Sequence, residues 1–235
     1  MVEIQLDSLA LHRYLHLHGL IADNVNLNYG VHAWLEAAFT GLGAKPWRLL
    51  MDKRRPTRIL AYSSFSASEF RTRISEFSDP SMFNVCPEPH LMINSRVMPN
   101  WAPGRRLGFE VLCCPVGRKS RSGIEKDVFL IKADQGGEGL QRNQVYTEWA
   151  AQMFAKYSVT LLNIRLAGFR LTKQERRGQK PEDTVRKRRL ITRPEALLAG
   201  ELIIGDSKQF MSLLAGGLGR HCSFGYGMIL LKPPA

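Results

Sequence analysis

The order of strand-like and helix-like segments constrains the fold of this chain most, because one order occurs twice. In residues 1–97, apolar and polar residues alternate in some segments, while apolar residues recur at helical spacing in others. These patterns predict, in order, a strand over 1–17, a helix over 29–39, strands over 47–51 and 58–62, a helix from Ser66 or Ser68 to Phe77, and a strand over 90–97.

The same order returns after residues 99–104, where two prolines and a glycine indicate a linker. The patterns predict a strand over 107–114, a helix over 143–157, strands over 160–171 and 197–204, a helix from Asp206 or Ser207 to Leu214, and a strand over 224–231. Consecutive β-α-β-β-α-β units are typical of the ferredoxin-like fold. We therefore expect an α+β protein with two tandem ferredoxin-like (RRM-like, βαββαβ) domains, over residues 1–100 and 104–235. This fold hosts many functions, so the function must be inferred from the sites.

The charge of the chain indicates a polyanionic partner. The formal net charge is +12, and nine basic and three acidic residues between Leu171 and Arg193 contribute +6 of it. Arginine binds phosphates through its planar fork, and a protruding basic hairpin suits the phosphate-lined major groove of an RNA stem. The alternative is a solvated basic loop, although solvated faces usually mix both signs. The predicted RNA-binding residues here are Lys173, Arg176, Arg177, Arg186, Lys187, Arg188 and Arg189.

Two smaller basic clusters have the same sign as this segment. Lys53, Arg54 and Arg55 lie on the predicted hairpin of the first half, and a further cluster over residues 118–121 follows the first strand of the second half. Each cluster alone is typical of a solvated turn. Because their signs agree, we predict that Lys53, Arg54 and Arg55 extend the RNA-binding track.

A glycine-rich segment near the C-terminus is typical of a loop that approaches an extended backbone closely. Five glycines stand in residues 216–227, and glycine tolerates positive φ angles. We expect Gly217 and Gly219 to contact RNA, with Arg220 and His221 adding positive charge to the turn. The alternative is a glycine-rich helix stop before an edge strand.

The sequence gives no signal for a membrane, a metal or a cofactor. It contains neither the roughly 20 consecutive apolar residues of a membrane span nor a signal peptide, so we expect a cytoplasmic protein without membrane association. The four cysteines lack C-x-x-C spacing. His16 and His18 share a face of the first predicted strand, but no acidic residue or cysteine lies close by to complete a metal site. We therefore expect no metal and no cofactor.

Three segments carry a resemblance to a known family. They are the Tyr-Gly-Val-His run at 29–32, the Gly-Phe pair at 168–169, and the block from Gly200 through the glycine-rich segment to Gly227. In these segments the chain resembles the CRISPR repeat endoribonucleases of the repeat-associated mysterious protein (RAMP) superfamily, most closely the CasE type of Cascade effector complexes. The related processing nuclease of type IV CRISPR systems is the alternative assignment.

The resemblance implies a metal-independent endoribonuclease that binds the repeat stem-loop of CRISPR RNA. In such an enzyme the ribose 2′-hydroxyl attacks the adjacent phosphate, which leaves a 2′,3′-cyclic phosphate and a 5′-hydroxyl. It implies that His32 is catalytic; Tyr29 shares its helix face, and we expect Arg220 and His221 to stabilise the charged phosphorane. It also implies that the enzyme retains its product and joins other subunits of a CRISPR effector complex.

One position departs from the family pattern. The family has lysine where this chain has Cys222, so Arg220 or His221 would have to replace that lysine at the phosphate. The alternative function is therefore a catalytically weak or inactive RNA-binding subunit. A metal-dependent nuclease would need clustered carboxylates, which are not apparent in the sequence. A general RNA-recognition module would need an aromatic-rich strand, of which Phe224-Gly225-Tyr226-Gly227 is only a faint echo.

Overall fold

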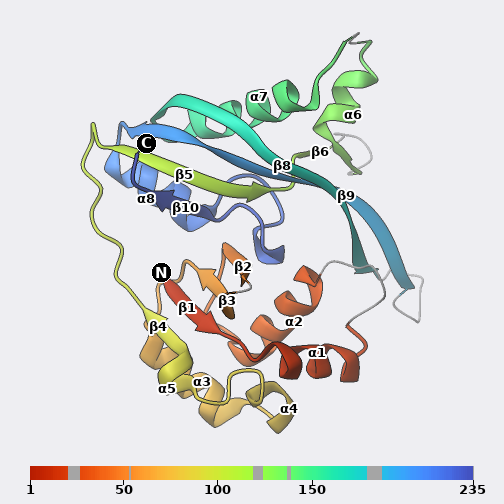
Figure 1. Ribbon diagram of the computed structural model, residues 1–235, viewed down its shortest axis with the longest axis vertical. Coiled ribbons are helices and arrows are strands. Elements are labelled where there is room, and N and C mark those ends of the chain that lie inside the picture. The colour runs from red at the N-terminus through yellow and green to blue at the C-terminus, as the bar shows by residue number, and fades with distance from the viewer. Residues whose placement is uncertain (21–26, 53, 119–123, 137–138, 179–186, 235) are drawn as a thin grey trace.

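The computed structural model describes residues 1–20, 27–52, 54–118, 124–136, 139–178 and 187–234, and over 174–178 and 187–190 it describes the backbone only. Two antiparallel sheets dominate the molecule, one built from the N-terminal half and one from the C-terminal half (Figure 1). None of the helices in these ranges has the length and apolar character needed to cross a membrane.

The first sheet comprises β1 (Val2–Gln5), β2 (Trp47–Asp52), β3 (Arg55–Ala61) and β4 (Ile93–Ser95), in the spatial order β2-β3-β1-β4. Neighbouring strands are antiparallel. The connections contain α1 (Ser8–Leu17), α2 (Asn28–Ala38), α3 (Ala67–Phe77), α4 (Pro80–Phe83) and α5 (Pro89–Met92). Buried residues of the sheet, such as Ile4 and Ile59, share a core with Trp34 of α2 and Phe70 of α3. The helix α3 begins after Ser66, as predicted, with a capping box between Ser66 and Glu69.

The predicted strand over residues 1–17 is wrong beyond residue 5. Asp7 accepts a hydrogen bond from the backbone N–H of Ala10 at 2.8 Å and starts α1. Leu11, Tyr14 and Leu15 are buried on one face of this helix. Their spacing of three and four residues is helical, and the alternating histidines hide it in the sequence. The predicted strand over 90–97 is likewise shorter, because α5 occupies residues up to Met92.

The second sheet comprises β5 (Arg106–Cys113), β8 (Val159–Gly178), β9 (Lys187–Ile204) and β10 (Ile229–Lys232), in the order β10-β5-β9-β8. In both sheets the order is therefore fourth, first, third, second strand, which confirms the ferredoxin-like prediction. Helices α7 (Arg142–Phe154) and α8 (Ser207–Gly216) supply Phe154 and Phe210 to the core of this half. An insertion carries β6 (Val116–Arg118), β7 (Glu125–Asp127) and α6 (Val128–Ala133).

The predicted last strand begins later than expected. Residues Cys222–Phe224 form a short 3-10 helix, η2, and β10 starts only at Ile229. Gly225 and Gly227 have φ angles of +81° and +78°, which interrupt an extended run. Because these glycines interrupt the extended backbone, the strand predicted over 224–231 was too long at its start.

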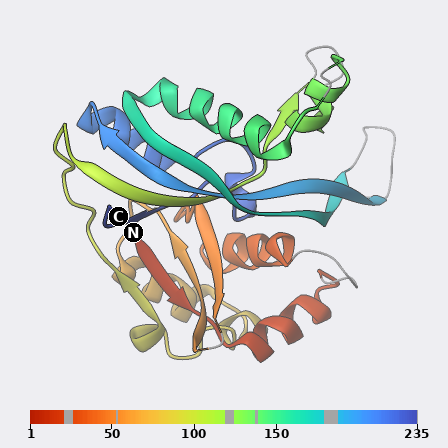
Figure 2. The ribbon, with the colours of Figure 1, turned by 45° about the horizontal axis from the view of Figure 1, so that its top comes forward.

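Strands β8 and β9 form a long hairpin that extends well past the other two strands of its sheet (Figures 1 and 2). Their register continues to the pairs Arg176–Arg189, Arg177–Arg188 and Gly178–Lys187. The predicted basic excursion is thus largely an extension of both strands. The hairpin tip, with Arg186, lies outside the described residues.

The two halves meet between the sheets, near the C-terminal loop. Tyr62 donates its hydroxyl hydrogen to the carbonyl of Ile229 at 2.8 Å, and Trp47 donates its indole N–H to the carbonyl of Ser223 at 3.0 Å. Both donors belong to the first half and both acceptors to the second. These contacts fix the glycine-rich loop against the first half.

Candidate active site

Helix α2 presents two of the predicted catalytic side chains beside the glycine-rich loop. Its residues Val31, Trp34 and Leu35 are buried in the first core, which fixes the rotation of the helix. Tyr29 and His32, three residues apart, are partly exposed on the side where η2 packs. The helical pattern predicted from the sequence therefore places both residues together.

Phe224 brings the two segments into contact. Its ring is stacked with Tyr29 at a centroid distance of 6.3 Å and meets His32 edge-on at 4.7 Å. The imidazole of His221 lies 6.1 Å from the same ring. Three of the four predicted catalytic residues thus surround one aromatic side chain, and we call Tyr29, His32, His221 and Phe224 the aromatic cluster.

A partly buried carboxylate, that of Glu125, holds the fourth predicted catalytic residue. Arg220 donates from Nε to Glu125 Oε1 at 2.7 Å, and Arg193 donates from Nη2 to Glu125 Oε2 at 2.6 Å. His221 Nε2 lies 3.0 Å from the same Oε2 atom. One carboxylate faces two arginines and a histidine, so the loop keeps a net positive charge that suits a phosphate.

Burial sets the protonation of both histidines. It lowers the pKa of His32, and the nearby Glu36 carboxylate only partly opposes this effect. Burial also lowers the pKa of His221, although Glu125 favours the protonated ring. The pKa of Glu125 is lowered overall: burial raises it, but the charges of His221, Arg193 and Arg220 outweigh burial. Both histidines are therefore mainly neutral near pH 7.

The glycines shape the loop around the thiol of Cys222. A Cβ atom at Gly217 would lie 2.9 Å from Cys222 Sγ, and one at Gly227 would lie 2.8 Å from it. Gly217 is buried, whereas Gly219 is exposed and packs its backbone against Trp149. The tight turns are therefore needed for packing inside the protein. Contact of Gly217 and Gly219 with RNA stays a prediction.

The predicted RNA-binding residues lie on two hairpins. Arg54 and Arg55 are exposed at the turn between β2 and β3, and Lys173 is exposed on β8. The backbones of Arg176, Arg177, Lys187, Arg188 and Arg189 lie in the extension of β8 and β9. Lys53 and Arg186 lie outside the described residues.

Sequence reasoning missed Glu125 and Phe224 as site residues and counted Arg193 only as part of the basic segment. Glu125 comes from the insertion, 95 residues before Arg220, and nothing in its local pattern distinguishes it from other acidic residues. Phe224 stands inside the glycine-rich segment, which was a usable signal. In the parts of the chain that the structure describes, no three histidine, cysteine or acidic side chains are grouped so as to hold a metal ion.

Solved structures share this fold over nearly the whole chain. The CRISPR endoribonuclease Cse3 bound to a 19-nucleotide RNA is 17% identical, with a TM-score of 0.63 and 99% coverage of both chains. Cse3 of Thermus thermophilus bound to an RNA representing a pre-cleavage complex is 16% identical, with a TM-score of 0.60 and coverage of 99% and 98%. Cas6e of Escherichia coli K-12 is 14% identical, with a TM-score of 0.52 and full coverage of both chains.

Sequence comparison identifies the family. No curated protein sequence matches the chain significantly. The family described as "CRISPR associated protein" matches residues 2–233, which is almost the whole chain. The protein is therefore a member of the CRISPR-associated protein family.

Proposed function

We propose that this protein is a metal-independent endoribonuclease that binds the repeat stem-loop of CRISPR RNA and cleaves the precursor into mature crRNA. The observation that carries the proposal is the aromatic cluster, in which two partly buried histidines from opposite halves of the chain face one phenylalanine. The similar Cse3 structures are described as an endoribonuclease bound to RNA, which supports the proposal.

The cluster contains the groups that cleavage by a 2′-hydroxyl requires. His32, neutral near pH 7, accepts the proton of the ribose 2′-hydroxyl as its oxygen attacks the adjacent phosphorus. The bond to the 5′-oxygen breaks, that oxygen takes a proton from a solvent water and leaves as a 5′-hydroxyl, and the phosphate remains as a 2′,3′-cyclic ester. The protonated His32 then returns its proton to solvent, which restores the enzyme. Tyr29 orients the reacting phosphate. Arg220 stabilises the extra negative charge of the phosphorane, and His221 does so in its protonated form, which Glu125 favours.

The position of Cys222 supports the use of Arg220 at the phosphate. The thiol packs inside the loop, and burial raises its pKa, so it carries no charge near pH 7. The Arg220 side chain is about half exposed while Glu125 holds its Nε. Its charge is therefore available at the surface of the same loop.

The long hairpin provides the surface for the RNA stem. Paired arginines on β8 and β9 place positive charge along both strands beyond the sheet, where the hairpin projects from the molecule (Figure 2). Arginines spaced along a projecting ribbon fit the phosphates that line an A-form groove. The exposed Lys173 continues this charge toward the sheet.

We also propose that the protein remains bound to crRNA as a subunit of an effector complex. Chains of similar fold occur in structures described as a CRISPR RNA-guided surveillance complex, with a TM-score of 0.57 in one of them. The second candidate function is an RNA-binding subunit without cleavage activity. The uncharged Cys222 inside the loop favours this second function.

The test is a single-turnover assay in EDTA with the hairpin repeat from the protein's own genomic neighbourhood. We expect cleavage of the unmodified RNA and none of a copy with a single 2′-deoxy nucleotide at the cut. The substitution His32→Ala should lower the rate by about 10²–10⁴-fold, the usual contribution of general acid–base catalysis. His90→Ala is the matched control, because His90 is exposed on α5 and belongs to no part of the cluster.

End analysis of the products should find a 5′-hydroxyl and a cyclic phosphate. Tight binding of both RNAs without cleavage would instead establish the second candidate function. Cleavage that needs a divalent ion, or that survives the 2′-deoxy substitution, would contradict the proposed chemistry.

A further inference from the structure

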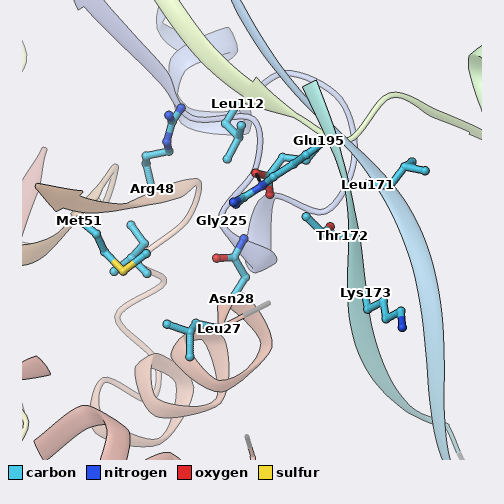
Figure 3. A pocket seen from close by; sticks show the side chains of 12 residues that line it. Leu27, Asn28, Arg48, Met51, Leu112, Leu171, Thr172, Lys173, Glu195 and Gly225 are labelled. Carbon is cyan, nitrogen blue, oxygen red and sulfur yellow. Dashed lines mark hydrogen bonds and ion pairs between the residues drawn. The ribbon is translucent and has the colours of Figure 1, made fainter. Parts of the chain in front are cut away.

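A cavity lies between the two halves, next to the aromatic cluster. Its volume is about 460 Å³, which is within the range of small-molecule sites. Strand β2 forms one wall with Arg48 and Met51, and strand β8 forms the opposite wall with Thr172 (Figure 3) and Arg170. The cavity therefore exists only because the halves are joined.

Two residues that line the cavity are adjacent in sequence to residues of the aromatic cluster. Asn28, which lines it, precedes Tyr29 on α2, and Gly225, which also lines it, follows Phe224. Gly225 and Asn28 are in close contact, since a Cβ atom at Gly225 would lie 3.1 Å from Asn28 Nδ2. A substrate that places its phosphate at the cluster thus has a neighbouring group at the mouth of this cavity.

The charge of the cavity suits a polyanion. The side chains of Arg48 and Arg170 line it, against the single carboxylate of Glu195. Arg170 donates from Nε to Glu195 Oε1 at 2.5 Å, and Tyr226 donates its hydroxyl hydrogen to Glu195 Oε2 at 3.1 Å. The buried Glu195 therefore fixes one edge of the Arg170 guanidinium, while the side chain remains 68% exposed.

The remaining walls suit a flat, apolar ring. Leu27, Leu49, Met51 and Leu112 contribute apolar surface, and Met51 is largely exposed. An unpaired nucleobase presents two apolar faces and a polar edge, and proteins bind such bases by stacking them on flat groups, including the arginine guanidinium. Asn28 and Thr172 provide hydrogen-bonding groups for the edge.

We propose that this cavity binds the base of an unpaired nucleotide of the RNA, adjacent to the scissile phosphate, with Arg170 and Met51 against its faces. This inference rests on the proposed function, since it places the base relative to the cut. It adds a specificity site to an enzyme that otherwise recognises its stem through the backbone.

The test combines abasic RNA with variants that fill the cavity. Abasic nucleotides are placed one at a time at the two positions on either side of the cut. We expect one of them to weaken binding of a non-cleavable 2′-deoxy hairpin by about tenfold, within the range found for loss of a stacked base. The substitution Met51→Trp fills the cavity, so this variant should bind the intact RNA about tenfold more weakly than the parent does. An abasic nucleotide should then weaken binding of this variant only slightly further.

Two further variants test whether the effect of Met51→Trp comes from filling the cavity or from a local disturbance by the tryptophan. Leu112→Trp fills the cavity from strand β5, in the second half, and should behave like Met51→Trp. Leu91→Trp is the matched control, because Leu91 is 61% exposed on α5, away from the cavity. In this variant the abasic nucleotide should weaken binding as much as it does in the parent. Thermal unfolding of each variant shows that it is folded.

The outcomes separate this inference from the proposed function. Cleavage of the hairpin with no position sensitive to base removal, or with equal sensitivity in parent and filled variants, would overturn the cavity proposal alone. Binding without cleavage would overturn the nuclease function, while the affinities still test the cavity. A position whose abasic cost disappears in both filled variants and persists in Leu91→Trp establishes the site.

Discussion

His221 Nε2 lies 3.0 Å from Glu125 Oε2, although the two residues are 96 positions apart in the chain. The carboxylate is held in turn by Arg193 in β9 and Arg220 in the loop. Glu125 therefore connects the base of the long hairpin to the loop that carries two predicted catalytic residues. An RNA stem on the hairpin and a phosphate at the loop would be positioned by the same group.

The substitution Glu125→Gln is expected to loosen the loop without removing the RNA surface. It removes the charge that pairs with two arginines, which should cost about 2 kcal/mol of unfolding free energy. Single-turnover cleavage should slow about tenfold, because the positioned loop contributes to transition-state stabilisation. Affinity for a non-cleavable hairpin should stay within a factor of about two, since no negative charge is added.

Urea denaturation, cleavage kinetics and equilibrium binding check this prediction separately. Glu76→Gln is a matched control, because Glu76 is exposed on α3 and belongs to neither the aromatic cluster nor the glycine-rich loop. A loss of affinity equal to the loss of rate would contradict a positioning role for Glu125.

Stability should fall as the pH drops from 7.5 to 5.5. The pKa values of His32 and His221 are lowered in the folded protein by burial, so the unfolded chain binds more protons in this range. The unfolding free energy therefore rises with pH through the ordinary histidine pKa of about 6.5. Urea denaturation over this range measures the slope. The slope should decrease in His32→Asn, and a slope equal to that of the parent protein would contradict the burial effect.

Alanine substitutions at two glycines of the glycine-rich segment should have opposite effects on stability. Gly225→Ala forces a side chain into a φ of +81° and places its Cβ 2.8 Å from the ring of Trp47. We expect a loss of about 1–3 kcal/mol in unfolding free energy, together with slower cleavage. Gly216→Ala, at the end of α8 with open space around it, should be neutral or stabilise by up to about 1 kcal/mol. Thermal unfolding of both variants decides this, and an equal loss would show that the turn is not strained.

Binding of the RNA stem should depend on salt through the long hairpin. Lys173→Ala is expected to weaken binding of every RNA stem similarly and to lower the slope of log affinity against log salt by about one. Lys208→Ala, an exposed lysine on α8, is the control and should leave the slope unchanged. Affinities measured at several salt concentrations provide the comparison. Equal slopes in Lys173→Ala and the parent would remove Lys173 from the RNA-binding surface.

The sequence predicted the parts of the fold that local patterns control. Apolar spacing located α2 and α7, and the side chains of Ser66 and Asp206 marked the starts of α3 and α8. The order of these elements was enough for the ferredoxin-like fold. One exception was α1, where alternating histidines concealed the helical spacing of Leu11 and Leu15, and another was α5, which replaces the start of the predicted strand over 90–97.

The sequence also suggested candidate catalytic residues, but it did not indicate which side chains contact them. Tyr29 and His32 share a helix face, and a spacing of three residues makes that visible. The arrangement around Phe224 depends on how η2 packs against α2, across nearly the whole chain. No local pattern encodes a contact of that separation.

The sequence by itself determined the succession of strands and helices, the net charge of the hairpin and the glycine turns, because each depends on residues a few positions apart. The tertiary structure alone decided that Glu125 holds Arg220 and His221 and that a cavity opens between β2 and β8. The cavity arises from packing one half of the chain against the other, and the contacts of Glu125 arise from folding the insertion onto the loop within the second half. In both cases side chains far apart in sequence come together, and burial then influences their charge and contacts.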